Sequence, residues 1–169
     1  MLTGIITQDN EQGRFYNSVL AVGNQSGQYH KTRLVPFGEY VPLESLLRGL
    51  IQFFDLPMSS LSVGPSNQIP LTVQKQLIAT AICYEVVYPD LVARNSRKSS
   101  LIVTVSNDTW FGESLGPVQH MQMVQMRALE NAKPIIRGTN NGISGLVDQR
   151  GNIYGRMDQN SIDELSGVV

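Results

Sequence analysis

The most reactive side chain type in this sequence occurs once, at Cys83. Cys83 follows the apolar run 77–82, and the sequence turns polar immediately afterwards, at Tyr84 and Glu85. A lone cysteine is more often an inert, buried residue than a nucleophile. Two features favour chemistry here. The residue is expected at the carboxyl end of a strand, where open α/β sheets bind ligands, and just before a helix, whose N-terminus stabilises a thiolate.

A thiolate that attacks an ester or amide forms a tetrahedral oxyanion, which requires a base and a positive or N–H group facing the oxygen. Lys31 is the best cation for this task, because it lies in an irregular, proline-containing segment rather than on a helix face. Glu39 follows eight residues later, after "LVPFG". A lysine and a carboxylate on one rigid loop could face the same pocket. The alternative is that both are ordinary surface residues.

The two histidines, His30 and His120, allow a second arrangement, a Cys–His dyad like that of a protease. His30 adjoins Lys31, and His120 lies near the start of an expected helix. Neither has an obvious orienting carboxylate nearby in the sequence. The lysine–carboxylate arrangement is therefore the preferred interpretation.

The elements that would position these residues alternate between strands and helices, which indicates a layered α/β fold. The helix at 118–131 is expected to present Met121, Val124, Ala128 and Leu129 on one face. The segment 133–157 is read as two strands joined by glycine-rich turns. The other expected strands are Leu2–Thr7, Phe15–Val22, Leu77–Ile82 and the run "SSLIVTVSND", and a first helix is expected at Val86–Arg94 with Pro89 in its first turn.

Composition narrows the class of protein. The length of 169 residues suits one domain, and the net charge of −1 with a pI near 6.1 gives no basic surface for nucleic acid. A single cysteine forms no internal disulfide. No segment is apolar for long enough to span a bilayer, and the N-terminus lacks the features of a signal peptide. We expect no metal and no cofactor.

Several motifs, in this order and spacing, resemble the nitrilase (carbon-nitrogen hydrolase) superfamily. They are "HKTRLVPFGEYVPLE", "AICYE", "SNDTWFG", "QHMQMVQMRALENAKPIIRGTNNGIS" and "DQRGNI". More narrowly, they resemble the catalytic domain of the bacterial apolipoprotein N-acyltransferase family, from Met1 to about Met157. The resemblance implies an α-β-β-α sandwich, so residues 1–169 are expected to form a partial nitrilase domain that is incomplete at its N-terminus.

The resemblance also implies roles for individual residues. Cys83 is the expected nucleophile of the family's Glu-Lys-Cys triad. Lys31 is expected to stabilise the tetrahedral intermediate, and Glu39 matches a second essential carboxylate on the loop after the lysine. The positions expected to bind substrate or the oxyanion are Tyr84, through its backbone N–H, Glu85 and Trp110.

The sequence departs from the family at one catalytic position. The general-base glutamate of the family lies upstream of the strand matched by "LTGII", and Glu11, which comes after that strand, is no substitute. The membrane helices of the family are also absent. The chain is thus expected to be part of a longer membrane enzyme and to be inactive alone. The strand left unpaired at the sheet edge would favour a homodimer.

The activity implied by the resemblance is acyl transfer. A phospholipid would donate its acyl chain to Cys83 as a thioester, and the N-terminal amine of a lipoprotein would accept it, on the periplasmic side of the bacterial inner membrane. The apolar stretch Leu46–Phe54 would be an arm that contacts the membrane, or else a buried amphipathic helix. Two alternatives stay open: a soluble amidohydrolase with water as acceptor, and a folded, non-catalytic binding module.

Overall fold

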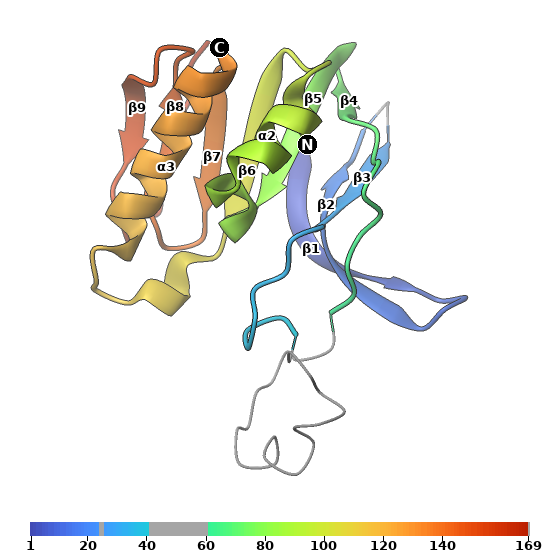
Figure 1. The fold of residues 1–169 in the computed structure, drawn as a ribbon. Helices are drawn as coiled ribbons and strands as arrows, with labels where there is room; N and C mark the ends of the chain where they lie inside the picture. Colours follow the sequence, from blue (N-terminus) through green and yellow to red (C-terminus); the bar gives the residue numbers. More distant parts are fainter. Residues whose placement is uncertain (24–25, 41–60, 169) are drawn as a thin grey trace.

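The computed structural model describes residues 1–23, 26–40 and 61–168. The first three strands form an antiparallel sheet in the order β1-β2-β3. Their bounds are β1 Leu2–Asp9, β2 Arg14–Ala21 and β3 Gly27–His30. β1 and β2 form a long hairpin that extends away from the rest of the chain (Figure 1).

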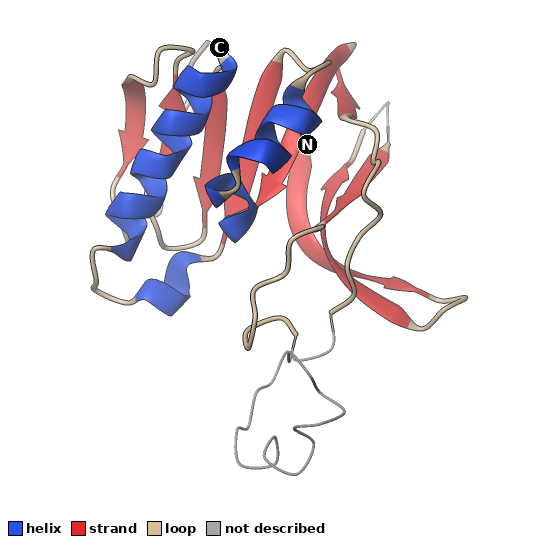
Figure 2. Ribbon diagram, in the orientation of Figure 1, coloured by secondary structure: helices blue, strands red, loops and turns tan. Residues whose placement is uncertain are grey.

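The second sheet has six strands in sequential order, and its central strands β5, β6 and β7 are parallel. Helices α2, Pro89–Ser96, and α3, Gly116–Asn131, make the crossovers between these strands and lie on the same face of the sheet (Figure 2). The strands are β4 Leu71–Val73, β5 Gln76–Ile82, β6 Leu101–Ser106, β7 Ile135–Thr139, β8 Ser144–Val147 and β9 Ile153–Met157.

Two apolar clusters fill the spaces between these layers. The larger lies between the helices and the six-stranded sheet, and includes Val124 and Ile135, both with no exposed surface. The smaller joins the two sheets: it contains Val19 from β2 and Ile82 from β5, and Val105 from β6 packs against it. A helix layer therefore covers one sheet, and that sheet packs on a second, which confirms the predicted nitrilase-like α/β class.

The first expected helix differs from the prediction in a way that matters for the site. Instead of one helix from Val86, the chain forms a 3-10 helix η1, Cys83–Val87, and then α2 from Pro89. The break follows from Pro89, which keeps the preceding Tyr88 extended, with φ −90° and ψ 102°. Cys83 is therefore the first residue of a tight turn rather than a residue ahead of a long helix.

Three other expectations have clear outcomes. Residues 133–157 form three strands, not two, because a second turn separates β8 from β9. Leu129 is 53% exposed, which corrects the expected apolar face, since it lies one position beyond the buried Ala128. The apolar stretch Leu46–Phe54 lies outside the described residues. None of the helices in the described part of the chain has the length and apolar content needed to cross a bilayer.

Candidate active site

Cys83 occupies a sharp turn at the carboxyl end of β5. Its φ of 51° lies in the left-handed region, which residues other than glycine seldom adopt. The residue is half-buried and packs against the cluster that joins the two sheets. The strand therefore ends at Ile82, directly before Cys83, as the apolar run predicted. The thiol is carried by the turn after the strand and not by the strand itself.

The carboxyl ends of β5, β6 and β7 meet at one edge because the three strands are parallel and adjacent. The loop after β6 begins with the 3-10 helix η2, Asp108–Phe111, which carries Trp110. The loop after β7 contacts it, since the Thr109 hydroxyl lies 3.2 Å from Oδ1 of Asn141. Trp110 is 72% exposed on this edge. Open α/β sheets bind ligands at such an edge.

Lys31 comes directly after β3 in the other sheet, and only 1% of its surface is exposed. Its Nζ donates to both carboxylate oxygens of Glu39, at 2.9 and 2.7 Å. Glu39 also accepts from the Asn17 amide at 2.9 Å and from the Val35 backbone N–H at 2.8 Å. The lysine is therefore a fixed, buried cation on the loop where the sequence placed it, and not a surface residue.

Glu85 connects the cysteine turn to the lysine loop. It is fully buried, and its Oε1 accepts from the backbone N–H groups of Thr32 at 2.7 Å and Arg33 at 3.1 Å. Its Oε2 accepts from the Ile82 N–H at 2.8 Å, and the Tyr29 hydroxyl lies 3.1 Å from both oxygens. One carboxylate thus holds the residue before Cys83 and the residue after Lys31.

This arrangement places Glu85 differently from the sequence expectation. It was expected to bind substrate, but its carboxylate is enclosed by donors from its own chain. The surroundings also affect Tyr29, whose pKa is raised by burial and then by the nearby Glu85 charge. Tyr84 and Trp110, the other two expected contacts, do reach the surface, at 38% and 72% exposure.

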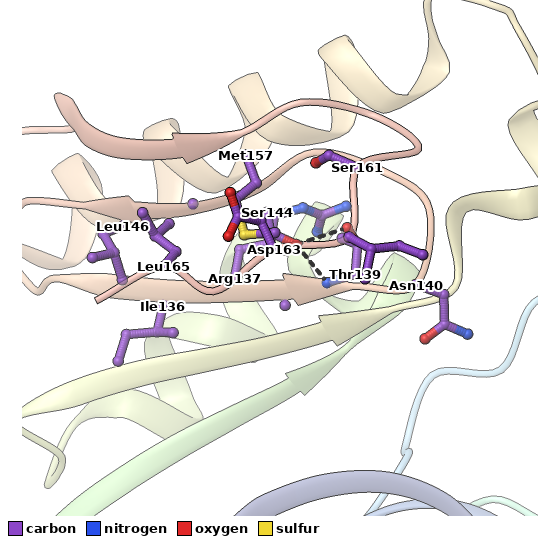
Figure 3. Close-up of a pocket in the computed structure, with 13 residues that line it drawn as sticks. Ile136, Arg137, Thr139, Asn140, Ser144, Leu146, Met157, Ser161, Asp163 and Leu165 are labelled. Carbon is purple, nitrogen blue, oxygen red and sulfur yellow. Dashed lines mark hydrogen bonds between the residues drawn. The ribbon is translucent and has the colours of Figure 1, made fainter. Parts of the chain in front are cut away.

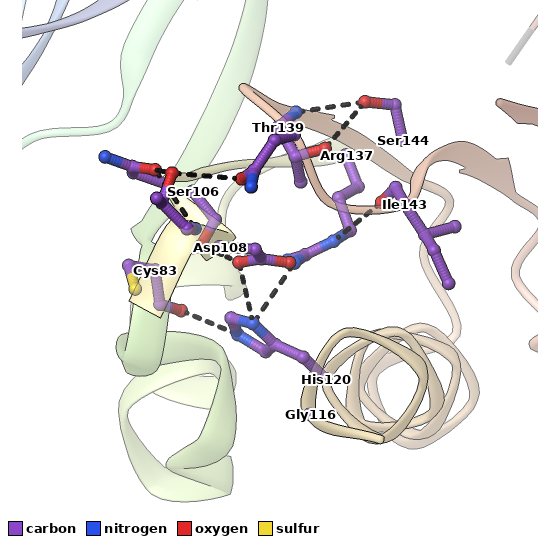
Figure 4. Close-up of polar contacts among 12 residues, drawn as sticks. Cys83, Ser106, Asp108, Gly116, His120, Arg137, Thr139, Ile143 and Ser144 are labelled. Carbon is purple, nitrogen blue, oxygen red and sulfur yellow. Dashed lines mark hydrogen bonds and ion pairs between the residues drawn. The ribbon is translucent and has the colours of Figure 1, made fainter. Parts of the chain in front are cut away.

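Neither histidine forms a dyad with the thiol. Nδ1 of His30 lies 2.8 Å from the Ser18 hydroxyl, and burial lowers its pKa. Nε2 of His120 lies 3.2 Å from the backbone oxygen of Cys83 (Figure 4). No orienting carboxylate was predicted for either ring, yet Asp108 Oδ1 lies 3.3 Å from Nδ1 of His120.

The sequence also did not reveal the buried polar residues that are connected to the cysteine turn through His120. Arg137 interrupts the apolar strand β7 and donates to Asp108 at 2.7 Å, with both side chains fully buried. A charged residue inside an apolar run was the signal that could have revealed it. Asn17, which holds Glu39, has no comparable signal, since it is one polar residue of an alternating strand.

Two cavities of the described residues lie away from this arrangement. One of about 410 Å³ lies between β7, β8 and the tail that carries Ser161, Asp163 and Leu165 (Figure 3). A second, of about 670 Å³, borders the β1–β2 hairpin and includes His30. Neither lining includes Cys83, Lys31 or Glu39. In the described ranges, no three His, Cys, Asp or Glu side chains gather as metal ligands.

Comparison with curated proteins gives close relatives over the whole chain. Apolipoprotein N-acyltransferase of Azotobacter vinelandii is 53% identical over 172 residues, and that of Pseudomonas aeruginosa is 49% identical over the same length. The enzyme of the same name from Vibrio cholerae is 42% identical over 179 residues. The alignments cover 100% of this chain but only 33%, 34% and 35% of those proteins. The chain therefore spans about a third of their length.

Solved structures share the fold at much lower identity. Nit3 of Saccharomyces cerevisiae, a member of branch 10 of the nitrilase superfamily, gives a TM-score of 0.71 at 18% identity, over 96% of this chain and 55% of Nit3. A glutamine-dependent NAD⁺ synthetase from Acinetobacter baumannii gives 0.73 at 17% identity, over 98% of this chain and 30% of the synthetase. The sequence itself matches the carbon-nitrogen hydrolase family over residues 1–166. The cysteine turn, the buried lysine and this match across nearly the full length agree, and the chain belongs to the carbon-nitrogen hydrolase family.

Proposed function

We propose that this chain supplies the thiol chemistry of an apolipoprotein N-acyltransferase. The observation that carries the proposal is the Glu85 carboxylate, which ties the Cys83 turn to the loop of the buried Lys31. A nucleophile and a fixed cation are thereby kept on neighbouring segments. The relatives of that name, 49–53% identical over the whole chain, supply the reaction.

The proposed reaction has two steps. In the first, the Cys83 thiolate attacks an ester carbonyl of a phospholipid, a thioester forms, and the lysophospholipid leaves as an alkoxide that takes up a proton. In the second, the N-terminal amine of a lipoprotein attacks the thioester carbonyl. An amide forms, the thiolate is released, and the amine proton passes to a base.

Lys31 would stabilise the oxyanion that forms in both steps, because its ammonium group is already fixed and largely removed from water. Glu39 would hold that ammonium in place, since it binds Nζ through both oxygens and is itself held by Asn17 and Val35. The backbone N–H of Tyr84, next to the thiol, is the proposed second donor to the oxyanion.

Apolar side chains around the site support an acyl chain as the group transferred. Phe37 on the lysine loop is 58% exposed, and Leu115, between η2 and α3, is 72% exposed. Tyr84 and Trp110 are exposed as well, so these loops present four large apolar or aromatic side chains that an acyl chain would cover. Trp110 would contact the lipid rather than the reacting atoms.

The proposed setting follows from the same reaction. A phospholipid donor and a lipoprotein acceptor place the site at a membrane surface, and we propose the periplasmic face of a bacterial inner membrane. The homodimer expected from an open sheet edge stays a prediction, with β1 as one edge of its three-stranded sheet.

A domain graft tests the proposal. The matching third of the Pseudomonas aeruginosa enzyme is replaced by this chain, and the chimera is expressed in cells depleted of their own enzyme. Mass spectrometry of a lipoprotein N-terminus should show an added acyl group with the wild-type graft and none with Cys83→Ala. A folded Cys83→Ala graft that still acylates the lipoprotein would refute the proposal. Release of free fatty acid with no acylated amine would favour hydrolysis instead.

A further inference from the structure

A buried polar cluster contacts the cysteine turn through the Cys83 backbone oxygen, and the reaction described above assigns it no role. Its members come from three elements: Asp108 from η2, His120 from α3 and Arg137 from β7 (Figure 4). Their exposed fractions are 0%, 3% and 2%. Burying a carboxylate, an imidazole and a guanidinium together is unfavourable unless the groups satisfy one another. The cluster therefore requires a structural or functional reason.

The charges of the cluster balance within one ion pair. Arg137 donates from a terminal nitrogen to Oδ2 of Asp108 at 2.7 Å and from Nε to the Ile143 carbonyl at 3.1 Å. Oδ1 of Asp108 accepts from the Ser106 hydroxyl at 2.6 Å. Burial alone would raise the pKa of Asp108, but the hydrogen bond with His120 and then the Arg137 charge lower it to about 2. Asp108 is thus ionised and paired with Arg137 inside the protein.

The partners of His120 fix which ring nitrogen carries the proton. Nε2 lies 3.2 Å from the Cys83 carbonyl oxygen, which can only accept, so Nε2 must donate. Nδ1 lies 3.1 Å from the Arg137 nitrogen, which can only donate, so Nδ1 accepts in the neutral ring. Asp108 Oδ1 lies 3.3 Å from Nδ1 and would accept a hydrogen bond from it if the ring carried a proton on both nitrogens. In that state too, Nε2 donates to the Cys83 carbonyl.

The Cys83 carbonyl matters because it belongs to the same rigid unit as the Tyr84 N–H. No peptide bond in the described residues is cis, so this C=O and N–H point in opposite directions. Holding the oxygen inward, against His120, aims the N–H away from α3. Tyr84 is the second residue of η1, where the backbone N–H has no partner within the helix. The same contact restrains Cys83 in its left-handed conformation.

We propose that His120, held by the Asp108–Arg137 pair, is a positioning residue that sets the Cys83–Tyr84 peptide so that its N–H can bind the oxyanion. This inference rests on the proposed acylation of Cys83. His120 touches neither the thiol nor the reacting carbonyl. Its effect is transmitted through one backbone hydrogen bond, and Asp108 and Arg137 act only by orienting its ring.

Two substitutions of similar length separate a hydrogen bond from simple packing. In His120→Gln the side-chain amide nitrogen is the same number of bonds from Cα as Nε2 and can still donate to Cys83. In His120→Met the side chain fills the space but donates nothing. Each variant of the full chain is treated with a p-nitrophenyl acyl ester, which forms an oxyanion, and separately with iodoacetamide, which alkylates the thiol without forming one.

The expected result is a change in one reaction only. His120→Met should slow acylation of Cys83 by roughly 10²-fold while alkylation changes little, because loss of one oxyanion donor has about that effect. His120→Gln should recover most of the rate. Equal rates of acylation in folded His120→Met and wild type would overturn the inference, as would equal losses in both reactions.

A measurement on the wild-type protein keeps the inference testable if His120→Met does not fold. Nitrogen-15 NMR of the imidazole should show a slowly exchanging proton on Nε2 of His120, and a bare Nε2 would overturn the inference. Failure of the wild-type domain graft to acylate the lipoprotein would instead contradict the proposed function, so the two failures are distinguishable.

Discussion

Replacing Glu85 with glutamine should lower the free energy of unfolding by about 3–5 kcal/mol, because an amide cannot reproduce the contacts of this carboxylate. The carboxylate accepts from the backbone of Thr32, Arg33 and Ile82 and from the Tyr29 hydroxyl. If the amide oxygen takes the Oε1 position, its NH₂ faces the Ile82 N–H and leaves it without an acceptor. That loss costs about 1–3 kcal/mol, and the remaining bonds each lose the part of their strength that came from the negative charge.

The assay is urea unfolding of the full chain, followed by far-ultraviolet circular dichroism so that both sheets contribute. Asp158→Asn is the control, because Asp158 makes an ion pair with Arg156 at 2.9 Å and both side chains are exposed, at 79% and 49%. Such an exposed pair is worth at most about 1 kcal/mol. The midpoint should therefore fall sharply for the first variant and little for the second.

The reasoning would be refuted if Glu85→Gln unfolded within about 1 kcal/mol of the wild type. If that stable variant also lost acylation of Cys83, the substrate-binding role that the sequence indicated for Glu85 would be correct instead. A large loss of stability together with slow acylation would support the structural role, in which Glu85 holds the cysteine turn beside the lysine loop.

Three further predictions concern the other buried charges. Glu39→Gln and Lys31→Met should each destabilise the chain by about 3–5 kcal/mol, with the double variant losing less than the sum in a denaturant series. The pKa of Asp108 is lowered from 3.8 to about 2 in the folded chain, so the ionised carboxylate adds about 2 kcal/mol to the free energy of unfolding. This contribution is complete when the pH is above the pKa of the unfolded chain, and it is lost as the pH falls toward 2. Unfolding free energies measured from pH 5 down to pH 2 should show that loss, and it should be absent in Asp108→Asn. Gly142→Ala should destabilise the fold strongly because a Cβ there would collide with the Asp108 carboxylate, whereas Gly138→Ala, where a Cβ meets nothing within 4 Å, should be mild in a thermal melt.

The parts of the fold that could be predicted were those set by local pattern. The apolar run before Cys83 and the polar residues after it predicted the end of β5, and the spacing of apolar residues predicted α3 within two residues of its start. The η1–α2 break could not be predicted from apolar spacing, because it depends on Pro89, which keeps Tyr88 out of the helical conformation.

The site itself could be predicted only in part. Cys83 and Lys31 stand out by type and position, but their connection through Glu85 joins residues more than 50 positions apart. Such contacts depend on how the two sheets pack, and no local pattern encodes them. The same holds for His120, whose partners on η2 and β7 are brought together only by the parallel arrangement of β5, β6 and β7.

The left-handed conformation of Cys83 also bears on how this position would change under relaxed selection. A residue with a Cβ is disfavoured there by roughly 1 kcal/mol or more, whereas glycine adopts the conformation freely. The backbone conformation of this turn therefore favours glycine over any residue with a Cβ. In a lineage that no longer needed the thiol, drift would be expected to favour glycine over alanine or serine at this position, so that a glycine here would mark a descendant that kept the fold after abandoning the chemistry.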